Sequence, residues 1–79
     1  MSRPRSESTP LAAFPTGAKS ETRVSLDTYG GRTFANLRDW YQSRDGTWKP
    51  TRRGVTINVA DLPALAEAVS RAIERAGDL

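Results

Sequence analysis

Large aromatic and basic side chains gather in one short stretch of this 79-residue sequence, residues 39–54, which reads DWYQSRDGTWKPTRRG. Its aromatic members are Trp40, Tyr41 and Trp48. Its basic members are Arg44, Lys49, Arg52 and Arg53. Aromatic rings stack on unpaired bases and basic side chains neutralise phosphates, so the mixture suits a surface that holds something flat and negatively charged. The alternative at this point is the core of a small hairpin.

The sequence offers few side chains that could act in covalent catalysis or bind a metal ion. The chain contains no histidine and no cysteine, which removes the commonest general base, the commonest metal ligand and all disulfides. The aspartates Asp27, Asp39, Asp45 and Asp61 are scattered over expected strand, turn and helix-cap positions, where structural roles suffice. We therefore expect a protein that is not an enzyme and has no metal and no cofactor.

The charge of the chain is unevenly distributed. Its formal net charge is +3. Residues 29–54 hold six basic residues, including Arg32 and Arg38, against Asp39 and Asp45 only, so this segment carries +4 and the remainder −1. A local concentration of this kind is typical of proteins that bind nucleic acid. The competing interpretation is that the basic residues form the solvated faces of edge strands.

The length and hydropathy of the sequence predict one small domain without a membrane segment. No apolar run is long enough to cross a bilayer, and the N-terminus lacks the apolar stretch of a signal peptide. The absence of cysteine suits a reducing compartment. We expect a cytoplasmic or nucleoid location in a prokaryote and a nuclear one in a eukaryote.

The expected secondary structure is four strands followed by one helix. Residues 1–20 are rich in proline and serine and predict a disordered tail, which leaves 21–79 as the domain. Alternating patterns predict strands at 22–29 and 32–41, joined by Gly30-Gly31, and shorter strands at 47–50 and 54–59 after a turn at 43–46. Apolar residues at helical spacing predict a C-terminal helix that ends at Gly77 and is capped by Asn58 or Asp61.

One helix can cover only one face of such a sheet. We expect the helix to pack on the apolar face, which is made by Val24, Leu26, Ala35, Leu37, Val55 and Ile57. The opposite face then presents Arg23, Tyr29, Phe34, Arg38 and Trp40. A dimer partner, a peptide or unpaired bases could each cover that face, and the mixture of rings and arginines favours unpaired bases over a closed duplex.

Beyond these patterns, the sequence from about Arg23 onward resembles the single-stranded-DNA-binding domain of the transcriptional coactivator positive cofactor 4 family. The resemblance rests on VSLDTYGGRTFANLRDWY, then DGTWKPTRRGVTI, then a terminal helix, in the family's order and spacing. It covers about three-quarters of the chain. The short tail, without a long serine-rich acidic region, is similar to the compact prokaryotic members.

The resemblance implies an α+β fold: a curved four-stranded antiparallel sheet (β-β-β-β-α) with one C-terminal helix that forms the dimer interface through Leu65, Val69 and Ile73. It also implies DNA contacts at matching positions. Gly30 stands where some relatives carry a lysine, and Trp48 is counted as a contact although a place in the core would also explain it. The implied DNA-binding residues are Tyr29, Arg32, Arg38, Tyr41, Trp48, Lys49, Arg52 and Arg53.

Our leading hypothesis is a homodimeric, largely sequence-independent single-stranded-DNA-binding protein that acts as a transcription cofactor or in replication or repair. RNA or melted duplex are further nucleic-acid partners that the sequence leaves open. The alternatives are a protein-interaction adaptor of RNA polymerase or the repair machinery, and a single-stranded-RNA binder.

Overall fold

The computed structural model describes residues 7–78 and contains four strands, a short 3-10 helix and one α-helix. The strands are β1 (Glu7–Gly17), β2 (Ser20–Tyr29), β3 (Arg32–Gln42) and β4 (Trp48–Asn58), and they are followed by η1 (Val59–Asp61) and α1 (Leu62–Gly77). All neighbouring strands pair antiparallel in the order β1-β2-β3-β4. The predicted class, a four-stranded antiparallel sheet with one C-terminal helix, is confirmed.

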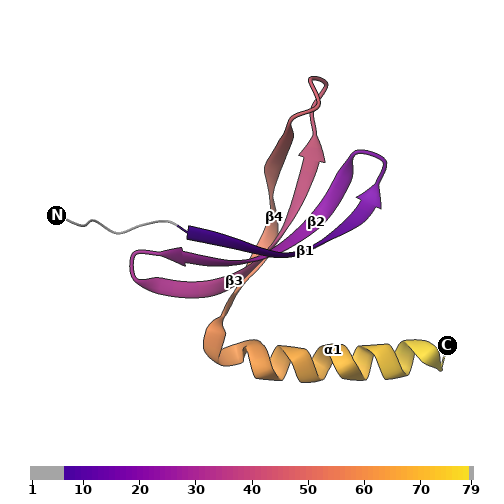
Figure 1. Cartoon of the computed structure of the whole chain (residues 1–79). Coiled ribbons are helices and arrows are strands. Elements are labelled where there is room, and N and C mark those ends of the chain that lie inside the picture. The colour runs from indigo at the N-terminus through magenta and orange to yellow at the C-terminus, as the bar shows by residue number, and fades with distance from the viewer. Residues whose placement is uncertain (1–6, 79) are drawn as a thin grey trace.

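The sheet is strongly bent and twisted, so its hairpins point in different directions. Figure 1 shows the β2–β3 hairpin running to one side while the β1–β2 and β3–β4 hairpins rise from the middle of the molecule. Gly30 and Gly31 form the β2–β3 turn with φ angles of 60° and 79°, which glycine adopts without the steric cost that other residues pay. The turn predicted from Gly30-Gly31 is therefore confirmed.

Two expectations about the strands were wrong. The segment Glu7–Gly17 was expected to belong to a disordered tail, but it forms β1 and pairs along its length with β2. Main-chain hydrogen bonds to an existing strand hold it, and these do not require the apolar periodicity that it lacks. The predicted strands 47–50 and 54–59 are parts of one strand, β4. The first residues of the expected tail, 1–6, lie outside the described residues.

A bulge in β4 joins those two parts. Arg38 pairs with Gly54 and Trp40 pairs with Pro50, so Thr51, Arg52 and Arg53 lie opposite Asp39 alone. The hydroxyl of Thr51 donates to the main-chain oxygen of Asp39 at 2.9 Å and holds the bulge against β3. Added residues of this kind bend a strand and change the direction of its side chains. The alternation of side chains along β4 is interrupted at the bulge, and for this reason the sequence predicted two short strands instead of one.

Gly54 follows the bulge at a place where β3 and β4 approach closely. A Cβ atom at this position would lie 2.5 Å from the main-chain oxygen of Leu37 and 3.0 Å from the Cα atom of Arg38. Only glycine avoids these contacts without a movement of the strands.

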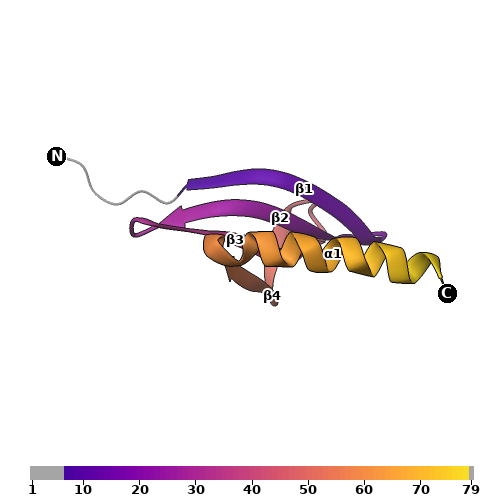
Figure 2. The ribbon, with the colours of Figure 1, turned by 90° about the horizontal axis from the view of Figure 1, so that it is seen from below.

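Helix α1 begins after Asp61, with Pro63 in its first turn, and ends at Gly77, which agrees with the later of the two predicted starts. Figures 1 and 2 show that it stands apart from the sheet and runs along one side of it. The expectation that it packs on the Val24 side of its own sheet is therefore wrong for the single chain. Within residues 7–78, no helix has both the length and the apolar character needed to cross a membrane.

The single chain has almost no buried core. Among the described residues, Ala35 is the one buried residue, and it still keeps 4% of its surface exposed. Val55 on the sheet is 56% exposed, and Ile73 on the helix is 69% exposed. Large apolar side chains are therefore left in contact with water on both the sheet and the helix.

Candidate nucleic-acid interface

One face of the β2–β3 hairpin combines arginines, aromatic rings and two carboxylates, Glu21 and Asp27. Residues that pair across antiparallel strands point to the same side of the sheet. The pairs on this side are Glu21 with Trp40, Arg23 with Arg38, Ser25 with Asn36, Asp27 with Phe34, and Tyr29 with Arg32. We name this surface the Arg23 face, and its grouping of Arg23, Tyr29, Phe34, Arg38 and Trp40 confirms the alternation seen in the sequence.

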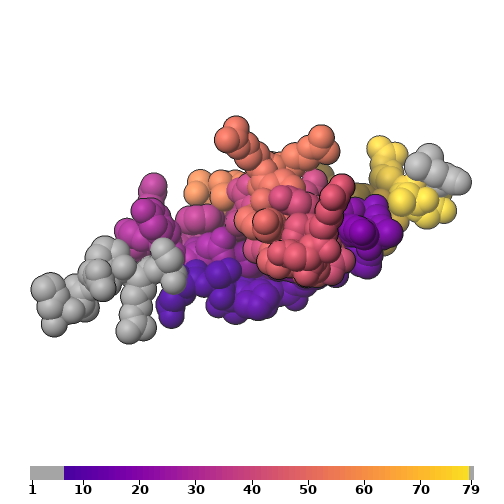
Figure 3. Space-filling model, turned by 90° about the horizontal axis from the view of Figure 1, so that it is seen from above, coloured from indigo at the N-terminus to yellow at the C-terminus, as the bar shows by residue number. Residues whose placement is uncertain are grey.

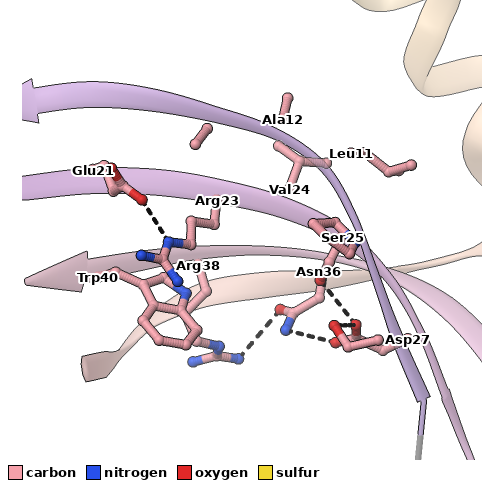
Figure 4. Close-up of a pocket in the computed structure, with 13 residues that line it drawn as sticks. Leu11, Ala12, Glu21, Arg23, Val24, Ser25, Asp27, Asn36, Arg38 and Trp40 are labelled. Atoms are coloured by element: carbon pink, nitrogen blue, oxygen red, sulfur yellow. Dashed lines mark hydrogen bonds and ion pairs between the residues drawn. The ribbon is translucent and has the colours of Figure 1, made fainter. Parts of the chain in front are cut away.

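A groove is hollowed into the Arg23 face. It has a volume of about 640 Å³, within the usual range for sites that hold a small molecule or a base. The side chains drawn in Figure 4 show Arg23 and Trp40 at one end and Asn36 and Asp27 at the other, with Arg38 between them. Ser8, Pro10 and Ala13 of β1 add one wall. Nearer the β2–β3 turn, Tyr29 and Phe34 line two further hollows that are separate from the groove.

Arg23 is stacked on the two tryptophans. Its Cζ atom lies 4.1 Å from the centre of the Trp40 ring and 5.4 Å from that of Trp48, both within the range of a cation–π interaction. Its Nε atom donates to the carboxylate of Glu21. Arg23 therefore occupies space over Trp40 and Trp48, and Trp48 belongs to a packed cluster rather than to a free stacking platform.

Asp27 forms a fixed negative charge on the same face. Its carboxylate accepts hydrogen bonds from Ser8, Ser25 and Asn36 at 2.7, 2.8 and 3.0 Å. Burial by itself raises the pKa of Asp27, but these hydrogen bonds and the charge of Arg38 outweigh it and hold the pKa below its ordinary value. The group is therefore ionised at neutral pH and favours N–H groups of a ligand over its phosphates.

Arg38 is largely engaged with its own chain. Its Nη1 atom donates to the main-chain oxygen of Thr51 at 2.9 Å, and its Nη2 atom lies 3.5 Å from the side-chain oxygen of Asn36. The guanidinium thus ties β3 to the bulge of β4. Within residues 7–78, no group of three or more acidic side chains could hold a metal ion.

The predicted DNA-binding residues do not all lie on one surface. Tyr29, Arg32 and Arg38 share the Arg23 face. Tyr41 alternates with Trp40 and pairs with Lys49, so both point to the opposite side of the sheet.

The remaining basic residues of the predicted set, Arg52 and Arg53, are exposed in the bulge of β4. Figure 3 shows side chains of the β4 segment projecting from the body of the molecule. The predicted set is therefore divided between the two sides of the sheet and the bulge of β4, and it does not form one row.

Sequence reasoning left Glu21, Arg23 and Asp27 out of the site. The alternation of residues in β2 did place Arg23 on the face that carries the groove, and this was the one sequence signal that pointed to it. The contact of Arg23 with Trp48 depends on the register of β3 with β4 across the bulge, and the contact of Asp27 with Ser8 depends on β1. Neither relationship could be read from a segment expected to be disordered or from two separate short strands.

The helix residues predicted for a dimer interface have accessible side chains. Val69 is 50% exposed and Ile73 is 69% exposed, while Leu65 is half-buried. They recur along α1 at intervals of four residues, which places them along one stripe of the helix.

Comparisons with known proteins agree with this architecture. The family model described as Transcriptional Coactivator p15 (PC4) matches residues 17–68. A crystal structure of a PC4 homolog from Burkholderia pseudomallei, in an orthorhombic form, is 27% identical, with a TM-score of 0.75 over 84% of this chain and 89% of that chain. The tetragonal form of the same homolog is also 27% identical, with a TM-score of 0.74 over 84% of this chain and 97% of that one. A search of curated proteins found no match.

Proposed function

Because this chain belongs to the Transcriptional Coactivator p15 (PC4) family, we propose that it is a homodimer that binds single-stranded DNA largely without regard to sequence. In this role it acts on exposed single strands as a transcription cofactor or during replication or repair. Family membership supports DNA binding and a coactivator type of role. The homodimer and the preference for single strands are inferences from the surfaces described above.

The observation that carries the proposal is the Arg23 face. This face carries an open groove lined by Arg23 and Arg38, and beside the β2–β3 turn it presents the ring of Tyr29, which is 68% exposed. Unpaired bases can stack on such a ring, and each stacked base contributes about 1–3 kcal/mol. A closed duplex keeps its bases stacked internally and could not use the ring in this way. The exposed Lys49, Arg52 and Arg53 supply further positive charge for the phosphates.

The proposal of a homodimer rests on the uncovered apolar side chains. A chain of this size needs additional buried surface, and a second copy can supply it. The stripe of Leu65, Val69 and Ile73 on α1 and the exposed Val55 on β4 are the surfaces that association would cover. Each fully buried apolar side chain contributes about 1.5–3 kcal/mol.

A fluorescence titration with oligo(dT) tests the function. Both tryptophans of the chain contact Arg23, so their emission reports on the Arg23 face. We expect quenching by the oligonucleotide and an affinity that falls steeply as salt rises from about 50 to 500 mM, since neutralised phosphates release counterions. Tight binding of a matched duplex but not of oligo(dT), or an affinity independent of salt, would contradict the proposal. A matched RNA oligomer in the same titration measures the preference for DNA over RNA.

A further inference from the structure

We propose that Arg23 binds a phosphate of the nucleic acid and that Glu21 competes with this phosphate, so that the protein binds DNA less tightly than the Arg23 face would otherwise allow. The inference rests on the proposed function, since it names two residues that tune the affinity of the same surface. Neither residue belongs to the set of DNA contacts that the sequence predicts.

The guanidinium of Arg23 presents an open edge. Its Nε–H is bonded to Glu21, but its two Nη atoms have no acceptor among the described residues. The side chain is 34% exposed and lies in the groove. Two parallel N–H groups on a planar guanidinium match the spacing of two phosphate oxygens. The open Nη edge can therefore receive a phosphate.

The position of Arg23 does not depend on Glu21 alone. The rings of Trp40 and Trp48, at 4.1 and 5.4 Å from the Cζ atom, hold the guanidinium by cation–π attraction. Ala13 of β1 pairs with Arg23 on the side away from β3 and fixes its backbone. Removing the charge of Glu21 should therefore leave the guanidinium where it is.

Glu21 neutralises the cation that a phosphate would use. Its side chain is only 20% exposed, and its carboxylate contacts the guanidinium directly, as Figure 4 shows. A second anion on the same guanidinium is repelled by the first, and this repulsion is weakly screened because the pair is partly buried. Glu21 therefore reduces the favourable binding free energy that a phosphate gains by contacting Arg23.

The decisive experiment compares oligo(dT) binding of the full-length wild type, Glu21→Gln and Glu67→Gln. The glutamine in Glu21→Gln keeps an acceptor for Nε–H and removes the charge. Glu67 is the matched control because it pairs with Arg71 on α1, so its substitution changes the net charge equally at a distance from the groove. We expect Glu21→Gln to lower the Kd roughly two- to tenfold and to steepen the salt slope by about 0.7, with Glu67→Gln unchanged.

A double-mutant cycle identifies Arg23 as the route of the effect. In an Arg23→Gln background, Glu21→Gln should bring no further gain. The inference is overturned if Glu21→Gln binds like wild type or more weakly, if Glu67→Gln gains as much, or if the gain persists without Arg23. If Arg23→Gln does not fold, the comparison of Glu21→Gln with Glu67→Gln is sufficient to accept or reject the inference. Wild type that fails to bind oligo(dT) refutes the proposed function itself, whereas wild type that binds with no difference between variants refutes only the role of Glu21.

Discussion

The Nη1 atom of Arg38 donates a hydrogen bond to the main-chain oxygen of Thr51 at 2.9 Å, across the segment where β4 bulges away from β3. The side chain is half-buried, and the carbonyl that it contacts lies in an irregular stretch of backbone. An arginine for which the family resemblance implies a DNA contact thus also has a structural role in the free protein.

Replacing Arg38 should therefore destabilise the fold as well as weaken DNA binding. We expect Arg38→Ala to lower the free energy of unfolding by about 1–3 kcal/mol, because a charged hydrogen bond to the bulge is lost. Urea denaturation at one fixed protein concentration measures the change, since the stability of a dimer depends on concentration. Arg44→Ala, in the exposed β3–β4 turn, is the control and should change stability by less than about 0.5 kcal/mol.

Gly54→Ala should damage the packing of β3 on β4. The new Cβ would lie 2.5 Å from the oxygen of Leu37, so the backbone must shift, and we expect a loss of more than about 2 kcal/mol. Gly77→Ala is the control, since a Cβ there meets nothing within 4 Å and the variant should be as stable as wild type or slightly more so. Equal denaturation midpoints for the two variants would show that the strands tolerate the added atom.

Acid should destabilise the protein partly through Asp27. The pKa of this carboxyl is lower in the folded chain than its ordinary value of 3.8, because hydrogen bonds from Ser8, Ser25 and Asn36 outweigh the effect of burial. A depressed pKa stabilises the fold above the unfolded pKa, and this contribution is lost as the pH falls through the folded pKa. We expect Asp27→Asn to flatten the dependence of unfolding free energy on pH below about pH 4.

Asp45 also contributes to the dependence of the unfolding free energy on pH, so the Asp27→Asn substitution does not remove that dependence completely. Hydrogen bonds from the side chain of Ser43 and the backbone of Thr47 lower the pKa of Asp45 as well, so the Asp27→Asn variant retains a part of the acid slope. Urea titrations of both chains at pH 7, 4 and 3 provide the comparison. Identical slopes for wild type and Asp27→Asn would mean that the hydrogen bonds to Asp27 add nothing to the stability.

Tyr41 tests whether DNA also uses the side of the sheet opposite the Arg23 face. The ring is 43% exposed beside Lys49. We expect Tyr41→Ala to weaken oligo(dT) binding by about 1–3 kcal/mol through lost stacking, while Tyr41→Phe, which keeps the ring, binds like wild type. Titrations at one salt concentration measure both. If Tyr41→Ala binds normally and Tyr29→Ala does not, the strand follows the Arg23 face alone.

The helix stripe tests the dimer. We expect Ile73→Asp to weaken self-association at least about tenfold, because a charge replaces an apolar side chain at the proposed contact. Sedimentation over a range of concentrations measures this. Ser70→Asp adds the same charge to an exposed position of α1 outside the stripe and should leave the dimer intact. A monomeric wild type, or an Ile73→Asp chain that associates normally, would rule out this interface.

The sequence predicted local structure better than relationships between distant strands. Alternation in β2 and β3 placed their two faces correctly, and Gly30-Gly31 marked their turn, because both signals depend on neighbouring residues. Strand β1 was missed because its main-chain hydrogen bonds to β2, rather than an apolar pattern, hold it in place. Pairing across the β4 bulge likewise brings Trp48 to Arg23, and no spacing within the sequence encodes that contact.

Prolines lie on both outer strands of the sheet. Strand β1 carries Pro10 and Pro15, each beside a shift of register, and β4 carries Pro50. A proline has no N–H to offer to another chain, and an irregular strand makes a poor template for further pairing. These features disfavour edge-to-edge pairing of the sheet with another chain, even though Leu11 and Phe14 lie exposed on its outer strand.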